Sequence, residues 1–382
     1  MLASRVENLK ESSTVKSAAL VAELRKKGMN VISFGMGEPD FTTPENIIEA
    51  AKRALDRGFT HYTPSNGIPE LREAIAEKCR RENGLDCTFE NVVVMPSKQA
   101  IFAAMFAVAN KNDTILLPDP GWVTYPACAS LCRASVEYYS GFCLKSEEIE
   151  KIIEKVEEKG KKIKLMVINT PSNPTGAVYD EGELKKIAAI AEEKSFYILS
   201  DEVYEKLIYE GKHTSIGKFC RDRVITVNGF SKTYAMTGWR LGWCIAHEGV
   251  LDAVKKINQH TQTCATSFGQ WGALEALKGD QESIKRMKRE FKKRRDFAFK
   301  RVSETGKLKC ELPKGAFYLF PRYDCDMNSQ EFCDKMLKEA NVLLTQGSAF
   351  GENGEKHFRM SYAASIEHIE RGIERIERVL EK

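Results

Sequence analysis

The sequence predicts an α/β fold, with a mainly parallel seven-stranded sheet sandwiched by helices and a smaller α+β domain. Two observations lead to this prediction. Short apolar runs rich in β-branched residues alternate with longer amphipathic segments, which is the pattern of strands joined by helices. Most of these runs are nearly continuous in apolar residues, so we expect strands that are buried on both faces, as in a mainly parallel sheet.

Seven apolar runs are the expected strands of this sheet. In chain order they are residues 91–95, 114–118, 135–139, 164–170, 196–202, 224–230 and 241–246. Helical patterns lie between most of them, such as SKQAIFAAMFAVAN at 97–110 and EGELKKIAAIAEEK at 181–194. We expect the units of strand, helix and parallel strand to wind with right-handed crossovers.

The chain changes character near residue 283. Residues 283–304 have the pattern of one long charged helix, after which a few strands mix with helices up to a final helix at 368–382. We therefore expect a large domain at 46–282 and a small domain at 283–382. The N-terminal arm, residues 1–45, is expected to join the small domain, because the first strand of the large sheet comes only later.

Composition and charge exclude several functional classes. With 382 residues and 42% hydrophobic content, the chain is globular and long enough for about two domains. Its net charge of +4 is spread along helical stretches, so no nucleic-acid footprint is expected. The beginning, MLASRVENLKESSTVK, has no apolar signal core, and no apolar run approaches the length of a membrane span. We expect a soluble, cytoplasmic protein that binds neither nucleic acid nor membrane.

The eleven cysteines are scattered along the chain. They form no CxxC pair and no cysteine–histidine cluster at zinc spacing, so no metal site is expected, and most should be buried, reduced thiols. Cys128 and Cys132 lie four residues apart and could share a helix face, where core packing is the favoured explanation.

Polar side chains follow the ends of several predicted strands, which is where open α/β sheets bind their ligands. They are Ser97 and Lys98 after the first strand, Trp122 in DPGW after the second, Asn173 in PSNPTG after the fourth, Asp201 and Tyr204 at the end of the fifth, and Ser231, Lys232 and Arg240 after the sixth. Each alone has an ordinary structural explanation, such as a helix start, a core tryptophan, an Asx turn, a structural ion pair or a solvated lysine.

Together these groups match few ligands, and pyridoxal phosphate is one of them. They comprise an amine, a carboxylate, a phenol, an amide, a flat aromatic ring, an arginine and a helix N-terminus, whereas the sequence has neither the GxGxxG fingerprint nor a P-loop. Pyridoxal phosphate uses all of them. Its aldehyde needs the lysine, its ring nitrogen the carboxylate, its ring oxygen the phenol and amide, its ring face the tryptophan, and its phosphate the arginine and helix end.

Eight segments also match a known family, in family order. They are GMGEPDFTTP (35–44), HYTPSNGIPELREAIA (61–76), PDPGWVTYP (118–126), NTPSNPTGAVY (169–179), SDEVYEKLIY (200–209), NGFSKTYAMTGWRLGW (228–243), PKGAFYLFP (313–321) and FRMSYAAS (358–365). On these segments the chain resembles the fold-type-I, class I/II aminotransferases, which use pyridoxal phosphate, over essentially its whole length. It resembles most closely their bacterial and archaeal aspartate aminotransferase subgroup.

The resemblance implies a role for each cofactor contact. Lys232 would bond covalently to the cofactor and act as the catalytic base, and Asp201 would keep the ring nitrogen protonated. Tyr204 and Asn173 would hydrogen-bond the ring oxygen, and Trp122 would stack on the ring. The implied phosphate ligands are Arg240, Ser231, the backbone N–H groups of Ser97 and Lys98, and Tyr62, which would reach the neighbouring subunit of a homodimer.

The resemblance also implies the substrate contacts. Arg359 would clamp the α-carboxylate with the help of the Gly37 backbone, beside Trp122 and Asn173. Lys98 and Thr14 match positions for a distal carboxylate, which favours aspartate as amino donor and 2-oxoglutarate as acceptor.

Other activities stay open at this point. Loop geometry could favour aromatic amino acids, prephenate or alanine, and the same scaffold could support a β-eliminating lyase. A non-catalytic regulatory module is disfavoured because Lys232 is present and no helix-turn-helix region precedes the domain. Two positions depart from the family pattern: Gly229 stands where a serine or threonine is frequent, and Pro96 where a residue with an N–H is usual. Each departure removes one contact that the phosphate could have used.

Overall fold

The computed structural model describes residues 3–7, 9 and 13–381, and its central element is one seven-stranded sheet. The strands are β2 (Val92–Val94), β3 (Thr114–Asp119), β4 (Ser135–Ser140), β5 (Ile163–Asn169), β6 (Tyr197–Asp201), β7 (Val224–Gly229) and β8 (Gly242–Ile245). Their spatial order is β2-β8-β7-β6-β5-β3-β4. All seven predicted strands are confirmed, and so is the α/β fold class.

One strand of this sheet runs against the others. β8 pairs antiparallel with both β7 and β2, whereas β3, β4, β5, β6 and β7 pair in parallel. The reversal arises because the connection between β7 and β8 turns back at the end of β7 and does not cross a face of the sheet. This connection contains α9 (Phe230–Thr233) and the short 3-10 helix η4 (Thr237–Trp239), so it holds Lys232 at the carboxyl end of the parallel strands.

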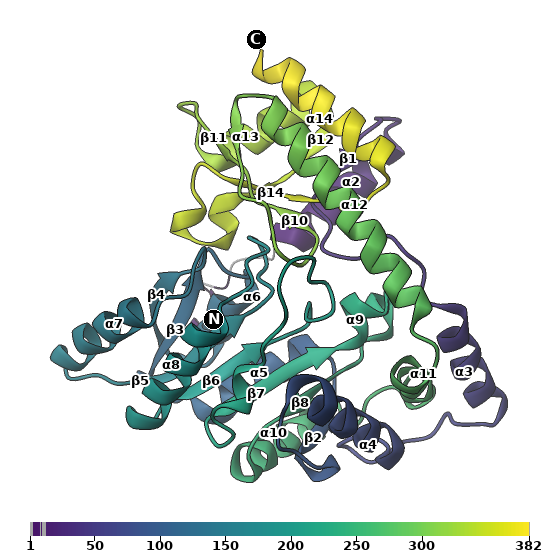
Figure 1. Cartoon of the computed structure of the whole chain (residues 1–382), viewed down its shortest axis with the longest axis vertical. Coiled ribbons are helices and arrows are strands. Elements are labelled where there is room, and N and C mark those ends of the chain that lie inside the picture. The colour runs from purple at the N-terminus through teal and green to yellow at the C-terminus, as the bar shows by residue number, and fades with distance from the viewer. Residues whose placement is uncertain (1–2, 8, 10–12, 382) are drawn as a thin grey trace.

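Helices cover both faces of the sheet, in the lower half of Figure 1. They are α3 (Glu45–Asp56), α4 (Pro69–Lys78), α5 (Ser97–Val108), α6 (Thr124–Leu131), α7 (Ser146–Glu158), α8 (Glu181–Glu193), α10 (Glu248–Thr261) and α11 (Ser267–Lys278). Leu165 and Val167 of β5 lie in the core under α5, α6 and α10, whereas Met166 and Ile168 lie in the core under α7 and α8. Alternate residues of one strand thus enter opposite cores, as the apolar runs predicted.

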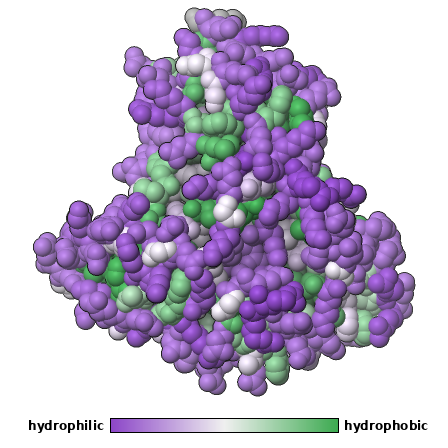
Figure 2. Space-filling view, viewed as in Figure 1, coloured by the Kyte–Doolittle hydropathy of each residue, from purple (hydrophilic) through white to green (hydrophobic). Residues whose placement is uncertain are grey.

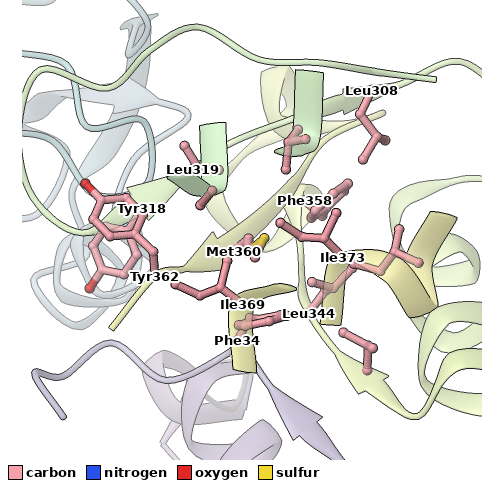
Figure 3. Close-up of a cluster of buried hydrophobic side chains, with 14 of the residues drawn as sticks. Phe34, Leu308, Tyr318, Leu319, Leu344, Phe358, Met360, Tyr362, Ile369 and Ile373 are labelled. Carbon is pink, nitrogen blue, oxygen red and sulfur yellow. The ribbon is translucent and has the colours of Figure 1, made fainter. Parts of the chain in front are cut away.

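The remaining elements pack around a separate core in the upper half of Figure 1. They are α1 (Ser4–Glu7), α2 (Ser13–Lys26), β1 (Ile32–Ser33), α12 (Glu282–Glu304), β9 (Leu308–Lys309), β10 (Tyr318–Leu319), β11 (Arg322–Tyr323), α13 (Ser329–Lys335), β12 (Val342–Leu343), β13 (Thr345–Gln346), β14 (Phe358–Ser361) and α14 (Ile366–Leu380). Two of them differ: α1 contacts α6, and α2 packs through Val21 in a small cluster with Val31 and Leu343. Phe34 lies among Leu319, Met360 and Ile369 (Figure 3). Residues near the start of the chain therefore pack with the C-terminal elements. The domain limits remain a prediction.

The surface gives two further findings. Figure 2 shows a mostly hydrophilic face, on which hydrophobic residues gather near the middle of the view, where the upper and lower parts meet. Among the helices that the structure describes, none combines the length and the apolar character needed to cross a bilayer.

Candidate active site

A cavity of about 460 Å³ opens at the carboxyl ends of β5, β6 and β7, and Tyr318 of β10 and Arg359 of β14 form its opposite wall. Eleven predicted site residues line it: Gly37, Ser97, Lys98, Trp122, Asn173, Asp201, Tyr204, Ser231, Lys232, Arg240 and Arg359. A larger groove of about 640 Å³, between residues 142–145 and 309–314, contains none of them.

Two predicted residues, Tyr62 and Thr14, are not among the described residues that line this cavity. The Tyr62 side chain is 86% exposed and does not line it. Thr14 belongs to α2, but its side chain lies outside the described part of the chain, so its predicted contact stays a prediction.

Lys232 points its amine at the opposite wall of the cavity. Its Nζ donates a hydrogen bond of 2.6 Å to the Gly37 carbonyl oxygen. Burial lowers the pKa of Lys232 to about 8, with Arg359 and Arg240 adding to the effect and Glu38 opposing it. The amine therefore loses its proton closer to neutral pH than an ordinary lysine does, which favours its use as a general base.

The backbone after Lys232 is strained. Ala235 and Arg240 have φ values of 51° and 56°, in the left-handed region that residues with a Cβ rarely adopt. Such conformations persist where the surrounding structure enforces them. Here the two bends let one short connection present both Lys232 and Arg240 to the same cavity.

Asp201 is a buried carboxylate at the end of β6, only 3% exposed. Its Oδ2 accepts a hydrogen bond of 2.7 Å from the Tyr125 hydroxyl, and no described residue forms an ion pair with it. Burial raises its pKa to about 6, although the Tyr125 hydrogen bond opposes the rise. A buried carboxylate without a cation is costly, and a protonated ring nitrogen would supply the cation that this site needs.

Arg359 presents a donor that has no acceptor. The residue is 1% exposed; its Nη1 donates to Asn173 Oδ1 at 2.9 Å and its Nη2 to the Gly35 carbonyl at 2.8 Å, while its buried Nε has no partner. Its guanidinium lies 4.4 Å from the centre of the Tyr318 ring. An unpaired buried donor costs free energy that a bound carboxylate would recover.

The residues around Arg359 hold this wall together. The Tyr318 hydroxyl is 2.8 Å from the Tyr204 hydroxyl. A Cβ on Gly37 would lie 3.0 Å from that Tyr318 hydroxyl and 3.8 Å from each terminal nitrogen of Arg359. Gly37 therefore lets its backbone pass close to the arginine.

The start of α5 forms a cradle for an anion. α5 begins directly after Pro96, and no side chain caps its first turn, so its leading N–H groups have no side-chain acceptor, and Ser97 and Lys98 of this turn line the cavity. The Ser97 hydroxyl donates to the Asn228 carbonyl at 2.9 Å. A Cβ at Gly229 or Gly242 would lie 2.2 or 2.3 Å from the Ser97 Oγ. Gly229 thus leaves the space that the Ser97 hydroxyl occupies, which is a physical reason for this departure from the family pattern.

Lys98 and Trp122 lie together on another side of the cavity. The Lys98 Nζ is 5.0 Å from the centre of the Trp122 ring. Burial lowers the pKa of Lys98, and the nearby Arg240 lowers it further. A cation that is partly stripped of water beside a flat ring suits an anionic group on a ligand.

Several residues that line the cavity were not predicted from the sequence, namely Glu38, Tyr125, Asn169, Thr237 and Tyr318. Tyr125 had a detectable signal, since it follows Trp122 by three residues, about one helical turn. Tyr318 lies within a quoted family segment, but nothing local indicates that its hydroxyl meets Tyr204.

Comparisons with known proteins agree with this geometry. A model of the family "Aminotransferase class I and II" matches residues 29–376. The chain is 42% identical to an aspartate aminotransferase of Pyrococcus abyssi and 42% identical to aromatic-amino-acid aminotransferase 2 of Thermococcus litoralis, each over 92% of both chains. A solved aspartate aminotransferase of Thermus thermophilus with maleate superposes with a TM-score of 0.95, at 37% identity over 99% of both chains.

These similarities cover nearly the whole chain, and the cavity has groups suited to the cofactor's ring nitrogen, phosphate and aldehyde. The chain belongs to the class I and II aminotransferase family, whose members of this type are pyridoxal-phosphate-dependent transaminases.

Proposed function

We propose that this aminotransferase moves the amino group of L-aspartate to 2-oxoglutarate. The observation that carries the proposal is the buried Arg359, which has an unpaired Nε and lines the same cavity as Lys232. Lys98 offers a second cation in that cavity, suited to the distal carboxylate of a dicarboxylic substrate. The relative from P. abyssi is an aspartate aminotransferase by name, and the T. thermophilus aspartate aminotransferase was solved with maleate, a dicarboxylate.

The chemistry is divided among the residues of the cavity. Bound pyridoxal phosphate supplies an electron-withdrawing ring that makes the α-proton of an attached amino acid acidic. The Lys232 Nζ takes this proton and later returns it, which its lowered pKa favours. Asp201 provides the counter-charge for the ring nitrogen, while Tyr204 and Asn173 bind the ring oxygen. The transfer to the oxo acid reverses these steps, so ping-pong kinetics are expected.

The remaining residues bind and orient. Trp122 stacks on the ring, and Arg359 holds the α-carboxylate beside the Gly37 backbone. The phosphate is held by Arg240, Ser231 and the N–H groups of Ser97 and Lys98 at the start of α5. A cytoplasmic location belongs to the proposal, and the eleven free cysteines support it.

A panel of single amino acids tests the proposal. The holoprotein is expected to absorb in the visible, to lose that absorption with aspartate, and to recover it with 2-oxoglutarate. A faster response to phenylalanine or alanine would replace aspartate by an aromatic or alanine donor. Release of pyruvate and ammonia without an acceptor would indicate an eliminating lyase, and a colourless preparation after incubation with pyridoxal phosphate would refute the assignment.

The homodimer is a further part of the proposal, with Tyr62 acting on the neighbouring subunit's phosphate site. The 86% exposure of Tyr62 away from its own cavity supports this role. The test mixes two variants that each lack one residue of the proposed site, Tyr62→Ala and Lys232→Ala, under conditions that exchange subunits between dimers. A hybrid dimer then contains one site with both residues intact, so activity above that of either parent is expected. No gain in a mixture that light scattering shows to be dimeric would place Tyr62 outside the neighbouring site.

A further inference from the structure

Asp119 is a buried carboxylate that the proposed chemistry does not use. It ends β3, is 4% exposed, and forms no ion pair with any residue that the structure describes. Burial raises its pKa, and backbone N–H groups of Asn353 and Glu352 oppose the rise. Since a buried carboxylate without a cation is costly, the contacts that keep it in place are informative.

Those contacts join the end of β3 in the large sheet to the segment that precedes β14 in the upper half of Figure 1. The Asn353 N–H donates to both Asp119 oxygens, at 3.1 and 3.3 Å, and the Asn353 side-chain amide donates to the Asp119 carbonyl at 3.4 Å. The Gly121 N–H donates to the Phe350 carbonyl at 2.7 Å. We call residues 119–121 and 350–353, with these hydrogen bonds, the latch.

Gly351 shows how closely the two sides of the latch approach. Its φ is +133°, and a Cβ there would lie 2.0 Å from Asp119 Oδ1. Only glycine combines this backbone conformation with this contact. The latch therefore depends on one residue from each side, Asp119 and Gly351.

The latch connects two walls of the cavity: the one with Trp122 and Lys232, which we call the cofactor wall, and the one with Tyr318 and Arg359, which we call the carboxylate wall. Trp122 follows Gly121 directly, and the Phe350 ring centre lies 5.0 Å from the Arg359 guanidinium. Residues 119–121 of the latch are held in the large sheet, because the Asp119 carbonyl also accepts a hydrogen bond of 2.9 Å from the Gly141 N–H. A broken latch would therefore displace mainly Phe350 and, through it, Arg359.

We propose that Asp119 and Gly351 are positioning residues that fix Arg359 relative to the cofactor wall and so set the affinity for the substrate carboxylate. The inference rests on the proposed function of Arg359. Neither residue lines the cavity, so the effect is transmitted through Phe350. Substrate binding should depend on the latch, whereas cofactor binding by Lys232 and Asp201 should not.

The test compares Asp119→Ala and Gly351→Ala with Asp119→Asn, which keeps an acceptor oxygen. The control is Gly306→Ala, because Gly306 also has a positive φ, of +64°, but no atom lies within 4 Å of an added Cβ. Both latch variants should raise KM for aspartate and the Kd for succinate roughly tenfold, as expected from losing one charge-assisted hydrogen bond. The visible band, the cofactor Kd and kcat should stay near wild type, Asp119→Asn should recover part of the loss, and Gly306→Ala should bind as wild type does.

Three results would overturn the proposal: unchanged succinate affinity in Asp119→Ala, an equal loss in Gly306→Ala, or a parallel fall in cofactor affinity. If Gly351→Ala does not fold, the two Asp119 variants decide the question. Succinate binding is followed by the intrinsic fluorescence of the protein, so it needs no turnover. A wild-type protein that binds succinate but transfers no amino group would refute the proposed function and leave the latch testable.

Discussion

Replacing Lys232 by alanine should lower turnover by at least about 10⁴-fold, because the change removes the residue proposed both to attach the cofactor covalently and to act as general base. The amine has no substitute, since the other cations of the cavity are already engaged. Arg359 binds Asn173 and Gly35, Arg240 Nη1 binds the Thr237 carbonyl, and Lys98 lies against Trp122. Cofactor binding should persist, because the contacts to its ring nitrogen and phosphate are unaffected.

Mass spectrometry after borohydride reduction checks the two functions of Lys232 separately. Wild type should gain the mass of the reduced cofactor on the peptide that contains Lys232, and Lys232→Ala should gain none while still binding cofactor in dialysis. Thr233→Ala is the matched control, since it changes the neighbouring residue of α9 that does not line the cavity and keeps the amine. Full turnover in Lys232→Ala would exclude Lys232 as the base.

Replacing Lys78 by alanine should reduce the free energy of unfolding by about 3–5 kcal/mol, because it leaves the Glu205 carboxylate buried without its cation. The Lys78 ammonium contacts Glu205 directly, and both side chains are about 5–6% exposed. The Asn83 amide donates to the second Glu205 oxygen at 2.6 Å. This pair joins the end of α4 to the segment after Asp201, so the loss should appear in thermal and denaturant unfolding.

The pH dependence of the free energy of unfolding is a second test of the contribution of the Lys78–Glu205 pair. Burial alone would raise the pKa of Glu205, but Lys78, His213 and Asn83 lower it to about 2. A depressed carboxyl pKa contributes stability above the unfolded value of 4.5, and this contribution is lost as the pH falls toward about 2. Lys78→Ala should weaken this acid-dependent loss. The exposed pair Lys52–Glu49 is the control, and Lys52→Ala should leave the stability close to that of wild type. Equal losses in both variants would contradict the argument.

The strands could be predicted because each is one contiguous apolar run, and Lys232, Asp201 and Asn173 could be predicted because they follow strand ends. The partners of these residues could not. Tyr125 meets Asp201 across 76 residues and Tyr318 meets Tyr204 across 114, and such pairs leave no periodic pattern in the sequence. They depend on how α6 and β10 pack against the sheet, which is a property of the whole fold.

Two other features of the site could not be predicted from the sequence, for different physical reasons. The predicted role of Tyr62 requires a second copy of the chain, so one chain cannot display it. The collision of a Cβ at Gly229 with the Ser97 hydroxyl involves the end of β7 and the start of α5, and only their three-dimensional approach reveals it. Sequence reasoning therefore found the departure at Gly229 and could not find its cause.

The hydrogen bond from Arg359 to the Gly35 carbonyl spans 324 residues and has a consequence for biosynthesis. At the usual speed of translation, roughly 20 to 60 seconds separate the synthesis of these two residues. The large sheet can be complete during this interval, because β8 ends at Ile245. The wall that contains Arg359 can form only after Arg359 has left the ribosome, so a nascent chain can hold the residues proposed to bind the cofactor before it has the arginine proposed to bind the substrate.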